Sequence, residues 1–448
     1  MDIPYFGRGI HIPKQKPVGD ILEIPPPDKV FLLLQQCAGP ICVPVVEAGD
    51  TVKIGQLVAE GAKGQAPDLH SPICGIVKGL EDVIAPNGTV TKALVVESNG
   101  GFEMETFEPD PDPLSKSGAE LLEEIRKAGI VTSRREAHSL EALIREAMDP
   151  HGFVSATGSV IARPVRQIAV RFTDVDPHLA TLKTITREIG EKTDRLHLGL
   201  KVLQKITGTK DLHFVLDRNQ DAPGLVQLAE DNEYSILRVN AGTYPSAADP
   251  LVACAIGGRE PDVAFRGVHE SGELVLDVDT VLRVARAVAE RRPVLDRLIT
   301  VGGSFGVKVV KIYIGMTLAD IAEAAGETEE YGKVLVGGPL QGSALHTLDF
   351  PMAKDSTAIW LFRPEEVVEE VNHPCISCGL CVMVCPMRLL PGLLSRYCEF
   401  GKWQEAEEAH LFSCIECGCC SYVCPAERSM VQFMVHGKNE VLALWRSR

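Results

Sequence analysis

Two short cysteine runs near the end of the chain carry the residues best suited to chemistry. In each run, three cysteines are separated by two residues, a fourth follows after three more residues, and a proline comes next. Three thiolates at this spacing wrap one side of an iron–sulfur cube, while the fourth points away from it. The proline ends the local helix and turns the chain away. The runs comprise Cys375, Cys378, Cys381, Cys385 and Pro386, and then Cys414, Cys417, Cys420, Cys424 and Pro425.

The duplication predicts that the two runs exchange one ligand each. In two-cluster ferredoxins the fourth cysteine of a run binds the cluster of the other run, so we predict two [4Fe–4S] clusters. Structural zinc is the alternative, but its ligands usually form two separated cysteine pairs, which two consecutive runs fit less well. The predicted ligands are Cys375, Cys378, Cys381 and Cys424 for cluster 1, and Cys414, Cys417, Cys420 and Cys385 for cluster 2.

The distribution of the other cysteines favours metal over disulfides. The chain has fourteen cysteines, of which all but Cys37, Cys42, Cys74 and Cys254 lie between Cys375 and Cys424. Disulfide frameworks are typical of short secreted chains, whereas clustered cysteines in a cytosolic protein indicate metal binding. Cys398 and Cys419 fit no ligand position, and we expect both to be small buried residues.

Composition and charge narrow the class of protein. The 448 residues suffice for several domains, and their formal net charge of −16 argues against a nucleic-acid partner, which requires a basic face. No apolar run approaches the ~18–20 residues that span a bilayer, and the start of the chain lacks the layout of a signal peptide. We therefore expect a cytoplasmic protein whose membrane contact, if any, is through a partner.

Hydrophobic patterns divide the chain into four regions. The stretches VPVVEAGDTVKIGQLVAE and HSPICGIVKGL alternate apolar residues with turn signals, and they look like the barrel-sandwich fold of biotinyl and lipoyl domains. Lys63 lies there in a glycine-rich loop without the carrier signature, so a purely structural domain is expected. Further on, the strand patterns RQIAVRFTD and LHFVLD alternate with helical patterns, which predicts an α/β layer fold. One helical pattern runs from PHLATLK to its end at Gly208.

The predicted boundaries follow changes in these patterns. An acidic, proline-rich linker over 101–115 separates the first two domains, and two helices broken at Gly401 are expected between the cysteine runs. The predicted domains are a barrel-sandwich hybrid over 1–100, an α/β Rossmann-like domain over 116–298, a small β-grasp domain over 299–364 and a helical two-cluster ferredoxin-type domain over 365–448.

Several motifs together resemble the C subunit of the Rnf electron-transport complex. The strongest are CISCGLCVMVCPMRLLP and EFGKWQEAEEAHLFSCIECGCCSYVCP at the end of the chain. GIHIPKQK, GDTVKIGQLVAE, YPSAADPLVACAIGGREPD and VGGPLQG are similar to other segments of that family, in the same order. The resemblance implies a β-grasp domain of the soluble-ligand-binding type, and a protein that works with membrane-bound partners.

The departures from that family concern its flavin and NADH site. The family's glycine-rich GGAGFPT loop should follow Val131, but here the chain reads TSRREAHSLEALIREAMDP, with no glycine before Gly152. Without glycines the backbone cannot approach phosphates as closely, which argues against bound FMN and NAD. The family's ECEPYLT segment appears as DVDPHLA, so Asp174 and Asp176 remain candidate cofactor-binding residues.

The resemblance and the clusters together predict an iron–sulfur electron-transfer subunit with no catalytic residues of its own. We expect it on the cytoplasmic face of the cell membrane, exchanging single electrons with a redox protein or flavin subunit of the same complex. Two alternatives stay open at this point. One is an FMN-containing NADH dehydrogenase subunit that passes hydride-derived electrons to the clusters, and the other is a soluble protein similar to cobalamin reductases.

Overall fold

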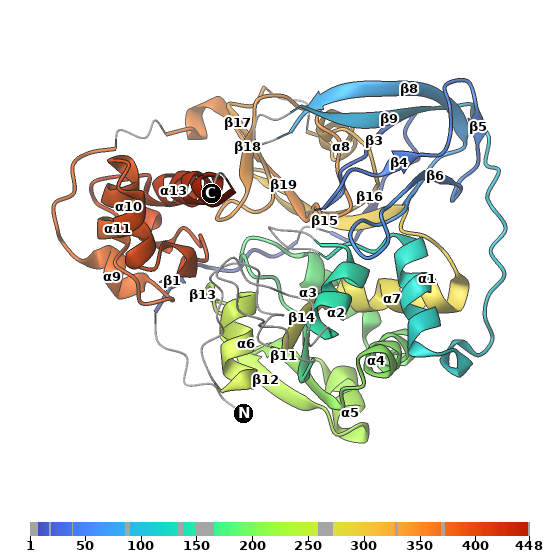
Figure 1. The fold of residues 1–448 in the computed structure, drawn as a ribbon, viewed down its shortest axis with the longest axis horizontal. Helices are drawn as coiled ribbons and strands as arrows, with labels where there is room; N and C mark the ends of the chain where they lie inside the picture. The colour runs from blue at the N-terminus through green and yellow to red at the C-terminus, as the bar shows by residue number, and fades with distance from the viewer. Residues whose placement is uncertain are drawn as a thin grey trace.

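In the computed structural model, the described residues form two four-stranded sheets, one six-stranded sheet, two smaller sheets and a helical C-terminal end (Figure 1). The C-terminal helices gather at one end of the molecule, and the long β8–β9 hairpin lies at the other. The structure describes residues 8–17, 19–37, 39–85, 90–132, 138–148, 165–258, 272–327, 330–368 and 372–446.

The N-terminal region confirms the expected barrel-sandwich hybrid. Alternation of apolar and polar residues places one face of each strand in a shared core, which contains Val30, Leu32, Val58, Leu94 and Val96. A sheet with the order β3-β9-β8-β5 faces a smaller one with the order β4-β6-β7. The strands are β3 (Lys29–Leu33), β4 (Val43–Pro44), β5 (Thr51–Val52), β6 (Leu57–Glu60), β7 (Leu69–His70), β8 (Gly75–Ile84) and β9 (Val90–Ser98).

Buried His70 in this domain leads to a prediction about acid stability. Burial, together with the nearby charge of Lys354, lowers the pKa of His70 to about 3. Between this value and the unfolded pKa of about 6.5, the unfolded chain binds a proton that the folded chain does not, so stability falls as the pH falls. We expect His70→Leu to lose less unfolding free energy than the parent protein between about pH 7 and pH 5, as measured by urea denaturation.

The exposed His346 serves as the control for that experiment. His346→Gln should leave the pH dependence unchanged. Asp174 and Asp355 act in the opposite sense, because burial raises each pKa to about 6 and the folded chain then binds the extra proton. Both acids are present in every variant, so an equal loss in parent and His70→Leu would contradict the prediction.

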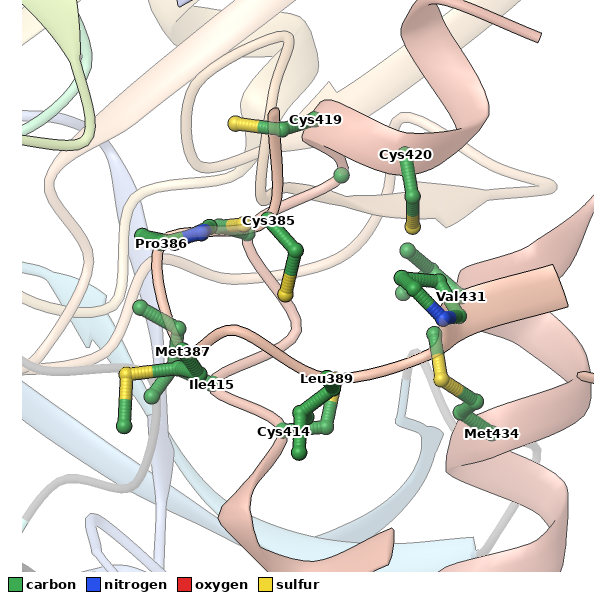
Figure 2. A pocket seen from close by; sticks show the side chains of 13 residues that line it. Cys385, Pro386, Met387, Leu389, Cys414, Ile415, Cys419, Cys420, Val431 and Met434 are labelled. Atoms are coloured by element: carbon green, nitrogen blue, oxygen red, sulfur yellow. The ribbon is translucent and has the colours of Figure 1, made fainter. Parts of the chain in front are cut away.

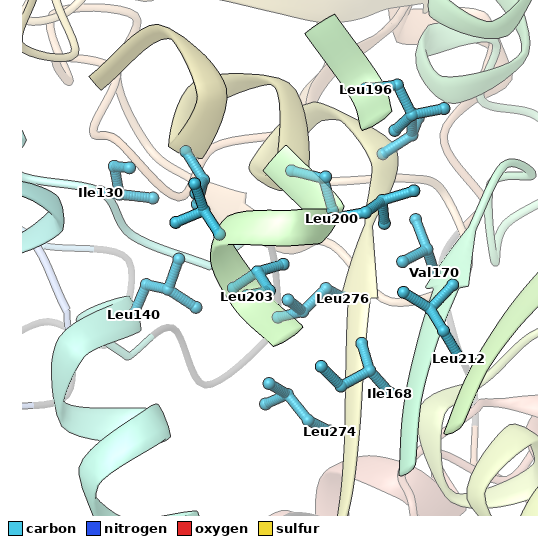
Figure 3. Close-up of a cluster of buried hydrophobic side chains, with 14 of the residues drawn as sticks. Ile130, Leu140, Ile168, Val170, Leu196, Leu200, Leu203, Leu212, Leu274 and Leu276 are labelled. Carbon is cyan, nitrogen blue, oxygen red and sulfur yellow. The ribbon is translucent and has the colours of Figure 1, made fainter. Parts of the chain in front are cut away.

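The central region is the expected α/β fold, with a parallel sheet in the order β12-β11-β10-β14. Figure 3 shows Leu196, Leu200 and Leu203, on one face of α4, directed at the sheet strands. Gly199 lets α4 approach α7 closely, because a Cβ there would lie 2.4 Å from the Val281 carbonyl oxygen. The strands are β10 (Gln167–Arg171), β11 (Asp211–Asp217), β12 (Ser235–Val239) and β14 (Glu273–Asp277).

One helical prediction in this region was too long. The pattern that ends at Gly208 forms two helices, because Gly190 takes a positive φ of 50° and ends the first of them. Gly208 closes the second in the left-handed conformation, as expected. The helices are α1 (Gly118–Ala128), α2 (Leu140–Met148), α3 (Thr181–Ile189), α4 (Asp194–Thr207), α5 (Pro223–Asp231), α6 (Asp249–Gly257) and α7 (Val278–Glu290).

A six-stranded mixed sheet follows, in the order β18-β17-β19-β15-β16-β2. Its edge strand β2 (Leu22–Glu23) comes from the N-terminal segment, as does β1 (Ile10–His11), which pairs with β13 (Thr243–Tyr244) in the α/β region. The start of the chain thus ties two later regions together. The other elements are β15 (Asp296–Gly303), β16 (Gly306–Tyr313), α8 (Leu318–Ala324), β17 (Lys333–Val336), β18 (Ser343–Leu345) and β19 (Ala358–Phe362).

The C-terminal end consists of short helices and one longer one. The predicted break at Gly401 is confirmed, since this residue has a φ of 66° between α10 and α11. No helix in the described ranges is long and apolar enough to cross a membrane. The C-terminal helices are α9 (Leu380–Val384), α10 (Pro391–Glu399), α11 (Trp403–Glu408), α12 (Cys419–Tyr422) and α13 (Met430–Arg446), with 3₁₀ turns at Pro364–Glu366 and Leu411–Ser413. A further 3₁₀ turn at Pro113–Ser115 lies before α1.

Candidate functional site

The two cysteine runs adopt the same backbone conformation. Gly379 and Gly418 take equivalent positions with φ near 80°, each just before the short helix of its run. Ser377 and Glu416 are also left-handed, although neither is glycine, and each donates its backbone N–H to the sulfur of the first cysteine in its run at 3.4 Å. Left-handed non-glycine residues are uncommon, so their repetition indicates that both loops are shaped for the same purpose.

One pocket unites the second run with the last cysteine of the first run. Cys385 lines it together with Cys414, Cys417 and Cys420. Figure 2 shows the sulfurs of Cys385 and Cys420 directed toward the same space. The pocket leaves about 330 Å³ free of protein atoms, part of it open to solvent. The rest of its wall is largely apolar and includes Met387, Leu389, Ile415, Val431 and Met434.

Two cysteines of the first run, Cys375 and Cys381, lie close to Gly392 at the start of α10. The point where a Cβ of Gly392 would lie is 3.5 Å from the Cys381 sulfur and 3.9 Å from the Cys375 sulfur. Cys378 is exposed, which sets this site at the protein surface. The backbone N–H of His373 donates to the Ala426 carbonyl at 3.0 Å, so the chain just before Cys375 runs beside the chain just after Cys424.

The two sites differ in burial. In the pocket Cys385, Cys417 and Cys420 are buried and Cys414 is partly exposed, whereas in the first run Cys375 and Cys381 are partly exposed and Cys378 is exposed. Burial raises the pKa of the Cys414 thiol to about 12 and also raises the pKa of Cys420. Thiolates, and not thiols, bind metal, so metal entering this pocket must displace protons.

In the described part of the chain, no three histidine, cysteine, aspartate or glutamate side chains meet closely enough to hold a single metal ion. Five cysteines nevertheless line the pocket, namely Cys385, Cys414, Cys417, Cys419 and Cys420.

The α/β region contacts the buried site through a side chain that sequence reasoning missed. The Tyr244 hydroxyl donates to the Cys417 carbonyl at 2.6 Å, and Tyr244 is fully buried. Cys419 faces the Tyr244 carbonyl, with its sulfur 3.8 Å away. Cys419 and Cys398 are both buried, as expected. The YP motif around Tyr244 was visible in the sequence, but only the fold brings it to the cysteines.

The two candidate cofactor-binding acids make hydrogen bonds within the protein. Asp174 accepts from the backbone N–H groups of Leu182 and Lys183 at the start of α3, and burial raises its pKa to about 6. Asp176 accepts from the Leu340 N–H at 3.1 Å and lies 2.8 Å from His178 Nδ1. Of the segment that replaces the glycine loop, residues 133–137 and 149–150 lie outside the described residues.

Lys354 is a second residue whose role the sequence did not reveal. Its side chain is fully buried where three regions meet. Its ammonium donates to the Asp68 carbonyl at 2.7 Å and to the Gly129 carbonyl at 3.0 Å. Burial lowers its pKa to about 8. Nothing in the local sequence distinguishes this lysine from an exposed one.

The fold and the site define an α/β protein with a barrel-sandwich hybrid domain and paired cysteine loops at its helical end. A family model described as the RnfC barrel sandwich hybrid domain matches residues 5–101. The chain is therefore similar to the RnfC family, in its first domain by the family model and along its length by its relatives.

Similar proteins extend this match over nearly the whole chain. The C subunit of the proton-translocating ferredoxin:NAD⁺ oxidoreductase complex of Clostridium ljungdahlii is 29% identical, over 97% of this chain and 93% of its own length. The corresponding C subunit of the Na⁺-translocating ferredoxin:NAD⁺ oxidoreductase complex of Acetobacterium woodii is 28% identical, over 98% of this chain and 97% of its own length.

Similarity to solved structures is lower. An NAD⁺-reducing [NiFe]-hydrogenase shares 16% identity with a TM-score of 0.45. That match covers 67% of this chain but only 55% of the hydrogenase chain, and it has no bearing on function.

Proposed function

We propose that this chain is the electron-relay subunit of an Rnf-type membrane oxidoreductase and holds two [4Fe–4S] clusters. The observation that carries the proposal is the shared pocket, in which Cys385 joins Cys414, Cys417 and Cys420. This is the exchange of ligands that the cysteine spacing predicts for a two-cluster ferredoxin. When bound, each cluster stores one electron at a time.

The pocket fits a cluster better than a single zinc ion. Zinc is held in direct contact by ligands at about 2.0–2.3 Å, so it leaves no free volume between them. In the described residues no three cysteine, histidine, aspartate or glutamate side chains meet closely enough to hold a single ion, whereas Cys385, Cys414, Cys417 and Cys420 line one pocket whose wall is otherwise largely apolar. The chain's own residues thus provide four sulfur ligands and a largely dry wall.

Cluster 1 is proposed to bind to Cys375, Cys378, Cys381 and Cys424. The convergence of Cys375 and Cys381 at Gly392 supports this assignment, as does the hydrogen bond that joins His373 to Ala426. Since Cys378 is exposed, this site is the one that a redox partner reaches at short distance. Cluster 2 would be held by the loop of Cys417, whose carbonyl accepts a hydrogen bond from Tyr244 of the α/β region.

The remaining domains are proposed to position this relay. We assign residues 299–364 to a β-grasp domain of the soluble-ligand-binding type and residues 365–448 to the two-cluster domain. The α/β domain acts as a scaffold in this proposal, because Asp174 and Asp176 are already bound to backbone N–H groups. Membrane-bound partner subunits supply the ion or quinone chemistry, and the chain docks on the cytoplasmic face.

The names of the two relatives favour one competing function. Both belong to ferredoxin:NAD⁺ oxidoreductase complexes, so a flavin and nucleotide site in the α/β domain is the second candidate. The relay proposal expects neither FMN nor NAD on this chain.

Anaerobic reconstitution of the full chain tests the relay proposal. Two clusters predict about eight irons and eight sulfides per chain, and EPR of the reduced protein should show two interacting S = ½ centres. Four or fewer irons per chain, or zinc in place of iron, would contradict the two-cluster proposal. Flavin absorbance after correction for the clusters, or bleaching by NADH, would support the second candidate.

A further inference from the structure

Lys438 is a partly buried positive charge beside the site of Cys385, Cys414, Cys417 and Cys420, which we call the inner site. It lies on α13, one turn after Met434, which lines the pocket of Cys414. Its ammonium donates to the Cys414 carbonyl at 2.6 Å and to Glu416 Oε1 at 2.7 Å. Only 16% of the Lys438 side chain is exposed. The charge is therefore held on a ligand residue and is only weakly screened by water.

The site of Cys375, Cys378, Cys381 and Cys424, which we call the outer site, has a different charge at the position that corresponds to Lys438 in the repeat. The helix that follows each run begins at Pro391 in one case and at Met430 in the other, and these residues correspond in the repeat. Glu399 on the first helix corresponds to Lys438 on the second. The Glu399 carboxylate binds the guanidinium of Arg428. The repeat is thus symmetric in its cysteines and backbone but opposite in charge at this position.

A nearby cation favours the reduced form of an iron–sulfur cluster. Reduction adds one electron, and so one negative charge, which a positive group stabilises most strongly where the local dielectric is low. Burial alone has the opposite effect, since it disfavours added charge. Charge, hydrogen bonds and solvent exposure around the sulfurs are the terms that set the reduction potential.

We propose that Lys438 raises the reduction potential of the cluster held by Cys414, Cys417, Cys420 and Cys385. Glu416 offsets part of this effect, but the ammonium of the pair lies on the Cys414 carbonyl. The inner cluster then retains an electron more readily than its buried position alone would allow. This inference rests on the proposed two-cluster relay and concerns only how its two centres differ.

Redox titration of the reconstituted full chain, followed by EPR, tests the inference. Lys438→Met should shift the potential of the inner cluster to a more negative value and leave the outer cluster unchanged. Lys438→Arg keeps the charge and should stay near the parent value. Glu416→Gln removes the counter-charge and should shift the same cluster to a more positive value. Lys402→Met is the matched control, because Lys402 is an exposed lysine in the same domain.

The outcomes separate this inference from the proposed function. If the parent protein binds about eight irons but Lys438→Met leaves both potentials unchanged, or shifts both equally, the role of Lys438 is wrong and the relay stands. If the parent binds four irons or fewer, the relay itself fails. If Lys438→Met fails to bind the inner cluster, the Glu416→Gln variant provides the test instead. An unchanged potential of the inner cluster in Glu416→Gln would then contradict the inference.

Discussion

Cys385→Ala is expected to remove about half of the bound iron and to abolish the inner cluster, although Cys385 belongs to the first cysteine run. The reason is geometric: its sulfur faces the pocket of Cys414, Cys417 and Cys420 (Figure 2). A cluster that loses one of its four thiolates in this largely apolar pocket is expected to be lost, since the Cys419 sulfur, which also lines the pocket, faces the Tyr244 carbonyl. Iron analysis should fall from about eight to about four per chain, and the EPR interaction between the two centres should disappear.

Cys398→Ala is the matched control for this variant. Cys398 is as well buried as Cys385 and lies between the two runs. It packs against Gly437, whose Cβ would lie 2.4 Å from its sulfur. The control should therefore keep about eight irons. If Cys385→Ala instead abolished the outer cluster and kept the inner one, each run would bind its own cluster, and the exchange of ligands would be wrong.

Lys354→Ala should lower the free energy of unfolding by about 3–5 kcal/mol, the range for leaving buried polar partners unpaired. The variant removes a donor from the buried carbonyls of Asp68 and Gly129 and opens a cavity between three regions of the chain. Because these carbonyls belong to the barrel-sandwich and α/β regions, loss of the ammonium also loosens the contact between them. Urea unfolding at neutral pH measures the effect.

Two further variants make the Lys354 prediction specific. Lys354→Met fills most of the space without a donor, so its stability should fall between that of Lys354→Ala and that of the parent. Lys333→Ala removes an exposed lysine at the start of β17 and should change the unfolding free energy by no more than about 0.5 kcal/mol. Equal stability of Lys354→Ala and Lys333→Ala would show that the buried ammonium contributes nothing net.

Local sequence patterns account for most of the structure that depends on neighbouring residues, with one exception. The capping box of Ser117 and Glu120 starts α1, and Gly129 ends it in the left-handed conformation. The alternating stretches of the N-terminal region form the expected sheets. The one long helical pattern failed at Gly190 because a single glycine with positive φ overrides the periodicity on both sides of it.

The sequence by itself determined the repeated cysteine spacing, the α/β class and the barrel-sandwich start, because each is written in residues a few positions apart. The spacing also predicted that Cys385 joins Cys414, Cys417 and Cys420. The tertiary structure alone decided that Tyr244 binds the loop of Cys417, that Lys354 is buried, and that Lys438 lies on the Cys414 carbonyl. These contacts join segments far apart in the chain. Packing and the need to pair buried polar groups determine which residues make these contacts. The spacing of residues in the sequence does not reveal them.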